Sequence, residues 1–178
     1  MATLNTKQFI QQIFIDELGV IVNTNPYISF MVMAVGIEFL GKCLNKSEQW
    51  NTNGASKTDF EHAIKSIPSL QKYSQYLEKY DLYHSFRCGL LHAAVPKYEI
   101  TLSSKNELPH LVENGNRLNL KAEDMYFDFK EACDFIINKE YDNRNKFERF
   151  ILSVPPISKD SLNKEFIVPP ASGSPDVD

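Results

Sequence analysis

The sequence predicts a mainly α-helical protein, a four- to five-helix up-down bundle with a small β-hairpin insert. Three observations carry this prediction. Apolar residues recur at helical spacing in segments near both ends of the chain. An almost wholly apolar segment follows an Asn-Pro pair of the kind that starts helices. β-forming residues gather in residues 97–120. At 178 residues the chain is long enough to bury a core without disulfides or metal.

Two helices are expected in the first quarter of the chain. Residues 5–22 have apolar side chains at helical spacing with polar residues between them. Asn25 suits an N-cap and Pro26 the first helical position of a segment that is apolar on nearly every side, as central helices are. Glu38 and Lys42 lie four residues apart on that helix, in the order that favours a helical ion pair.

The residue pattern in the middle of the chain predicts a loop followed by two further helices. A polar, turn-rich loop precedes a short helix over residues 57–66, which ends near Pro68. The next helix is expected over residues 70–94, with an interruption near Asp81, and it should end before Pro96 because the residue before a proline disfavours helical geometry.

The last third predicts the insert, one more long helix or helix pair, and a tail. Residues 97–120 suit a β-hairpin, with Gly115 able to take the positive φ of its turn. Helical spacing returns from about Lys121 to residue 153. Residues 154–178 are rich in Pro, Ser and Asp and are expected to form a flexible tail. The predicted helical domain therefore spans residues 1–153.

Composition narrows the class of protein. The formal net charge of −4 argues against a protein that coats nucleic acid non-specifically, although a local site is compatible with it. Three cysteines without a CxxC pair or Cys/His clustering disfavour a disulfide framework and a zinc site, so no metal and no cofactor are expected. The N-terminus lacks a secretory signal and the apolar run 28–37 is too short for a bilayer, which predicts a cytoplasmic protein without a membrane span.

One short segment, YDLYHSFRCGLLHAAV, places a cation among apolar side chains. On a helix turning about 100° per residue, Arg87 falls near the centre of a stripe of aromatic and aliphatic residues. Such an arginine must be buried, stacked or at an interface. Two of the four histidines of the chain, His84 and His92, lie on the same helix.

These residues carry a resemblance to a known family. Arg87 and His92 form an R-x4-H motif, and Glu38 and Lys42 supply an E-x3-K pair on a preceding helix. Together they resemble the HEPN superfamily, over about residues 5–153. The resemblance implies a small α-helical bundle domain and a metal-independent ribonuclease, often a toxin or antiviral effector, with Arg87 and His92 as its catalytic residues.

The chemistry fits these residue types. Cleaving RNA without metal requires a general acid or base, and imidazole has the ordinary pKa for that role. A planar guanidinium can stabilise charge on two phosphate oxygens together. On an ideal helix Arg87 and His92 are about 140° apart, so one narrow face should not present both. The resemblance implies a homodimer in which the two motif helices meet across a two-fold axis. Glu38 and Lys42 would support the motif, and His84 would contact RNA or be a surface histidine.

Other interpretations of the same residues stay open. Arg87 could form a buried structural ion pair with Glu38, and His92 could be an ordinary imidazole near a helix C-terminus. The chain would then be a non-catalytic HEPN-type module that binds RNA, nucleotide or a protein partner. An interaction scaffold, or a toxin paired with a protein antitoxin, is also compatible with the sequence.

Overall fold

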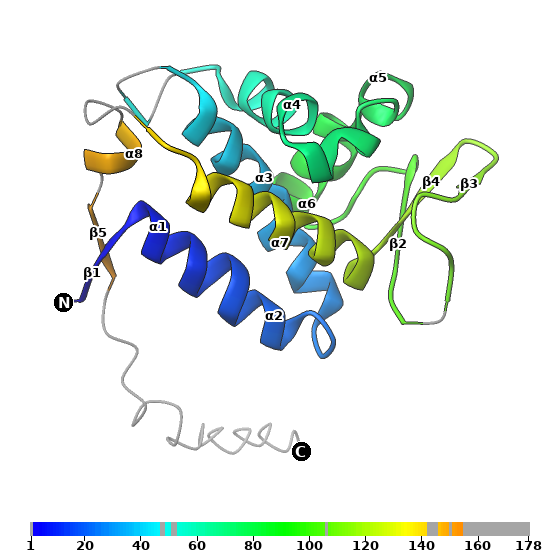
Figure 1. Ribbon diagram of the computed structural model, residues 1–178. Helices are drawn as coiled ribbons and strands as arrows, with labels where there is room; N and C mark the ends of the chain where they lie inside the picture. The colour runs from blue at the N-terminus through cyan, green and yellow to red at the C-terminus, as the bar shows by residue number, and fades with distance from the viewer. Residues whose placement is uncertain are drawn as a thin grey trace, which may run out of the picture.

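A computed structural model describes residues 2–46, 49–50, 53–105, 107–141, 146–149 and 151–154. It confirms that the protein is mainly helical, with a small mixed sheet at one end (Figure 1). The core is one continuous apolar cluster to which the helices and the strands β2 and β4 contribute.

The first predicted helix is present and is continuous over three segments of differing geometry. They are α1 (Thr6–Phe9), the π-helix η1 (Ile10–Glu17) and α2 (Leu18–Ile21). Asn5 and Gln8 form a reciprocal capping box at its start, which satisfies two backbone N–H groups that a helix end leaves free. The buried face of this helix is formed by Ile10, Phe14 and Leu18.

The central helix is α3 (Pro26–Leu44), which lies between α4 (Ser56–Ser66) and α7 (Ala122–Asn138) (Figure 1). Two glycines of α3 allow α7 and α4 to pack closely against it. A Cβ at Gly36 would lie 2.3 Å from the Phe129 ring, and a Cβ at Gly41 would lie 1.8 Å from the backbone oxygen of Asp59. Larger side chains at these positions would push α7 and α4 away from α3.

By length and composition α3 could also cross a membrane, and among the described residues it is the one helix that passes this test. More than half of the tested window, 56%, is buried inside the protein. The core helix of a soluble protein, mostly buried, passes the same test.

The single interrupted helix expected over residues 70–94 is four short helices. They are the 3₁₀-helix η2 (Pro68–Tyr73), α5 (Tyr76–Lys79), the π-helix η3 (Tyr83–Cys88) and α6 (Gly89–Ala93). The predicted interruption is confirmed: Asp81 has φ 44°, in the left-handed region that a continuous helix excludes. Ala94, with φ 55°, ends α6 two residues before Pro96.

The insert is a three-stranded mixed sheet and not the simple hairpin expected over residues 97–120. Strand β4 (Arg117–Lys121) pairs antiparallel with β3 (Glu113–Asn114) through a turn in which Gly115 has φ 57°. The same strand pairs in parallel with β2 (Ile100–Ser103) on its other side. The parallel pairing of β2 with β4 is an arrangement that the turn at Gly115 alone does not reveal.

The last helical segment is shorter than predicted. Helix α7 ends at Asn138, and a short helix α8 (Lys146–Arg149) and a strand β5 (Ile151–Val154) follow in place of helix up to residue 153. Strand β5 pairs antiparallel with β1 (Ala2–Asn5), so the two ends of the predicted domain meet. The predicted tail, apart from its first residue, lies outside the described residues.

Candidate functional site

The candidate site begins with a carboxylate buried in the central helix. The Glu38 side chain is 6% exposed, and its Oε1 lies 2.8 Å from Nζ of Lys42, one turn later on α3. Its Oε2 lies 2.6 Å from Nη2 of Arg87 on η3. The single carboxylate is thus shared by two cations, and the E-x3-K pair is confirmed as an ion pair that reaches the motif arginine.

The surroundings of Arg87 explain why a cation lies on an apolar stripe. Its side chain is 14% exposed, its guanidinium carbon lies 5.6 Å from the centre of the Tyr83 ring, and Nη1 lies 4.0 Å from Sγ of Cys88. The guanidinium is therefore paired, stacked and mostly buried at once. Two cations against one carboxylate leave the cluster of Glu38, Lys42 and Arg87 with one net positive charge, which favours an anionic ligand.

His92 lies beside Arg87 within one chain. Nη1 of Arg87 and Nε2 of His92 are 3.5 Å apart, and His92 is exposed. A guanidinium only donates hydrogen bonds, so this contact requires Nε2 of His92 to be the unprotonated ring nitrogen. The expectation that one narrow face cannot present both motif residues is wrong, because the two side chains meet within one chain.

Arg87 lies on the π-helix η3 and His92 on the following α-helix α6, so the contact crosses a change in helical geometry. Hydrogen bonds from residue i+5 to residue i, such as Gly89 N–H to the His84 carbonyl, bring residues five apart onto the same side of the helix. The other π-helix, η1, shows the same alignment: Gln11 donates to Asp16 and Gln12 donates to Glu17, both five residues apart. The segment that carries Arg87 is therefore not the ideal α-helix that residue spacing predicts.

Gly89, inside the motif, lets the chain fold back behind His92. The Val95 N–H donates to the Gly89 carbonyl, and a Cβ at Gly89 would lie 2.8 Å from the Val95 oxygen. The Tyr27 hydroxyl donates to the carbonyl of Ala94 and ties this turn to the start of α3. His92 is thus held on the last turn of α6, at the protein surface.

His84 is separate from the motif pair. Its Nδ1 lies 2.9 Å from both carboxylate oxygens of Asp81, and its ring packs edge-on against Tyr83. Burial raises the pKa of Asp81, but the hydrogen bond and charge of His84 outweigh it, so this pKa lies below its ordinary value. No contact within the described residues joins His84 to Arg87 or His92.

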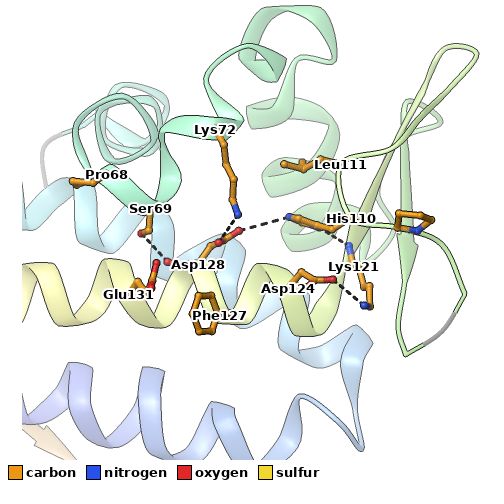
Figure 2. A pocket seen from close by; sticks show the side chains of 11 residues that line it. Pro68, Ser69, Lys72, His110, Leu111, Lys121, Asp124, Phe127, Asp128 and Glu131 are labelled. Carbon is orange, nitrogen blue, oxygen red and sulfur yellow. Dashed lines mark hydrogen bonds and ion pairs between the residues drawn. The ribbon is translucent and has the colours of Figure 1, made fainter.

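A second polar network, which the sequence did not reveal, lies at the floor of a pocket of about 740 Å³ between η2 and α7 (Figure 2). The Tyr73 hydroxyl lies 2.6 Å from Oδ2 of Asp128 and 2.8 Å from Nε2 of His110. Nζ of Lys72 lies 2.6 Å from Oδ1 of the same aspartate. Tyr73 and Asp128 are buried, and the His110 side chain is 10% exposed.

The hydrogen bonds of this network fix the proton positions. The backbone N–H of Lys121 donates to Nδ1 of His110 at 3.0 Å, so Nε2 carries the ring proton and donates to the Tyr73 hydroxyl. That hydroxyl donates to Asp128, because burial and the adjacent carboxylate hold the pKa of Tyr73 well above its ordinary value. Burial lowers the pKa of His110 to about 4, although the Asp128 carboxylate acts in the opposite direction.

One signal for this network is present in the sequence. Asp128 lies between Met125 and Phe129, on the apolar stripe of α7, just as Arg87 lies on an apolar stripe of its own helix. A buried charge needs a partner. Nothing in the sequence says that the partners are Tyr73, which its spacing assigns to the core, and His110 from the insert. Within the described ranges no group of three His, Cys, Asp or Glu could hold a metal ion.

We predict that Glu38→Gln lowers the free energy of unfolding by about 3 kcal/mol, because it leaves the buried Arg87 without its counter-charge. Urea titration measures the effect. The double variant Glu38→Gln/Arg87→Met should lose less unfolding free energy than the sum of the losses in Glu38→Gln and Arg87→Met. Each single variant leaves one buried charge without its partner, whereas the double variant removes both charges. Glu61→Gln is the control: its pairs with Lys57 and Lys65 are exposed, so its cost should stay under about 1 kcal/mol. Additive losses would contradict the coupling.

We also predict that His110 makes stability depend on pH. In the unfolded chain the imidazole binds a proton below about pH 6.5, whereas in the folded protein it stays neutral down to about pH 4. This contribution is complete above pH 6.5 and is lost as the pH falls toward 4, on the order of 3 kcal/mol. Urea titrations at pH 7 and 4.5 should show a smaller difference in His110→Gln than in the parent, and an unchanged difference in His62→Gln. An equal difference in all three proteins would exclude this role of His110.

Comparison of the chain with protein-family models, with curated proteins and with solved structures found no match in any of the three. The geometry of the Arg87–His92 site is therefore the basis for proposing a function.

Proposed function

We propose that the protein is a HEPN-like, metal-independent endoribonuclease that acts as a homodimer. The observation that carries the proposal is the 3.5 Å contact between Nη1 of Arg87 and Nε2 of an exposed His92, next to a cluster with net positive charge. An imidazole that can exchange protons with solvent and a guanidinium that can bind phosphate oxygens lie side by side. Both residue types can contribute to RNA cleavage without metal, the imidazole by proton transfer and the guanidinium by stabilising charge on the phosphate.

The proposed reaction is attack of the RNA 2′-oxygen on the adjacent phosphorus, with loss of the 5′-oxygen. His92 would take the proton from the 2′-hydroxyl, and an imidazolium would return a proton to the leaving 5′-oxygen. Arg87 would hold the phosphate oxygens through Nη1 while Nη2 stays on Glu38, which keeps the guanidinium oriented. Glu38 and Lys42 are positioning residues in this scheme, and His84 has no role in the chemistry.

A homodimer would supply the second imidazole. A proton is taken at one oxygen and given at another, so two histidines placed on opposite sides of the phosphate can do both in one step. The exposed apolar side chains of α3 favour such an interface, because Val35 is 42% exposed and lies one turn before Glu38, and Ile28 is 50% exposed. Two copies of this face related by a two-fold axis would bring both motifs into one cleft. The up-down bundle of the family and a cytoplasmic toxin or defence role, with or without an antitoxin, belong to the same proposal.

The second candidate is a non-catalytic HEPN-type module that binds RNA, nucleotide or a protein partner. The observation in its favour is that the Arg87 guanidinium is only 14% exposed and is paired with a buried carboxylate. The residue after the motif arginine is Cys88, where catalytic members of the family often have a polar residue. In this case Arg87 would serve structure, and RNA would bind without being cut.

We expect the purified protein to cleave single-stranded RNA in the presence of EDTA, and His92→Ala and Arg87→Ala to abolish the cleavage. His92 is exposed, so His92→Ala should keep its unfolding midpoint, which separates lost chemistry from lost folding. Arg87→Lys keeps the charge beside Glu38 and should also lose most activity, because an ammonium cannot replace the planar fork. His62→Gln serves as the matched control. RNA binding without cleavage in the parent protein would establish the second candidate instead.

We expect the protein to sediment as a dimer and Val35→Glu to sediment as a monomer. At a two-fold symmetric interface the variant would bury one carboxylate from each subunit, and the loss of hydration of both charges disfavours the dimer. Cleavage should fall with dimerisation. Val20→Glu introduces the same charge at a residue that is 75% exposed on α2, and it should leave the dimer intact. A parent protein that is monomeric and active would exclude the two-subunit cleft.

A further inference from the structure

A groove runs along α7 on the side that faces η2, away from the motif residues. It consists of the pocket of Figure 2 and a neighbouring pocket of about 410 Å³, and both are lined by Pro68, Ser69 and Glu131. From Asp124 to Asn138 the groove follows 15 residues of helix, which span about 21 Å from the first to the last. That length matches about six residues of extended chain.

Two exposed phenyl rings lie in this groove. Phe127 lines the first pocket and is 61% exposed, and Phe135 lines the second and is 36% exposed. Glu131 is four residues from each, so a carboxylate stands between two rings on one face of the helix. Large aromatic side chains that remain exposed inside a pocket lack the partner that would bury them.

The charges of the groove are unbalanced. Three lysines line it (Lys72, Lys121 and Lys139), against four carboxylates (Asp124, Asp128, Glu131 and Asp134). Lys72 is held by Asp128 and Lys121 by Asp124, whereas Glu131 and Asp134 form no ion pair within the described part of the chain. Nζ of Lys139 lies 5.8 Å from the centre of the Phe135 ring, so one ring already carries a cation. The Phe127 ring, beside Glu131, carries none among the described residues.

We propose that this groove binds a basic, extended peptide segment of a partner protein, with an arginine or lysine side chain over Phe127 and paired with Glu131. The ring face attracts a cation, and the adjacent carboxylate fixes its position. A second copy of this chain is a poor occupant because its own net charge is −4. A small cation would reach only one of the two rings, which are about 12 Å apart along the helix.

The test is fluorescence anisotropy of a fluorescein-labelled octa-arginine peptide titrated with the full-length protein at 0.1 M NaCl. Phe127→Ala and Glu131→Gln should each weaken binding about three- to tenfold. Glu78→Gln removes the same charge from an exposed position on α5, outside the groove, and should bind as tightly as the parent. Phe127→Ala leaves the net charge unchanged, so its loss of affinity would report contact with the ring.

Three results would overturn the proposal. Equal weakening by Glu78→Gln and Glu131→Gln would show diffuse attraction to an acidic protein. Unchanged affinity in Phe127→Ala would exclude the ring as a contact. If spermine displaced the peptide and bound with the same affinity as the peptide, the groove would be a site for small cations and not for a peptide. RNA cleavage should be unaffected by Phe127→Ala, so the outcome does not depend on the proposed ribonuclease.

Discussion

The buried carboxylate of Glu38 is the constraint on which the rest of the site depends. It lies on the most enclosed helix of the protein, where an unpaired charge would cost several kcal/mol. Lys42 forms an ion pair with one oxygen from the same helix, and Arg87 forms an ion pair with the other from a segment about fifty residues later. The pair fixes how α3 and η3 lie against each other. It also fixes the direction of the guanidinium, and so determines which of its nitrogens remains for His92.

The π-helix η3 places the guanidinium of this ion pair beside an imidazole that solvent can reach. A π-helix is a rare geometry that is often found at functional positions. Here Arg87 lies on the π-helix, and its Nη1 reaches to 3.5 Å from Nε2 of His92 on α6. Gly89 permits the fold-back that ends the segment, since a side chain there would meet the backbone of Val95. The motif thus combines a buried, oriented end at Glu38 with an exposed end at His92.

Much of this structure follows from the sequence, and the parts that do not have physical causes. Periodicity and the Asn-Pro start predict α3, the first helix and most of α7, because these signals are local. The Glu38–Arg87 pair is also foreseeable, since a cation on an apolar stripe needs a nearby anion.

The parallel pairing of β2 with β4 depends on contacts between distant residues and leaves no local signal. The contact of Arg87 with His92 crosses from the π-helix η3 to α6, and residue spacing does not specify where the helical geometry changes. The His110 network joins η2, the insert and α7, which lie far apart in the sequence and so leave no local signal.

The two polar networks differ in a way that separates their proposed roles. At the pocket of Figure 2, each hydrogen from His110 through Tyr73 to Asp128 has an acceptor, and Lys72 neutralises the carboxylate. A saturated, buried network stabilises the contact between η2, the insert and α7 but offers no free group to a substrate. At the motif, by contrast, the guanidinium keeps a nitrogen beside an exposed imidazole, and the cluster keeps a positive charge. Chemistry is therefore assigned to Arg87 and His92, while the groove above the saturated network is assigned to binding through its exposed rings and unpaired carboxylates.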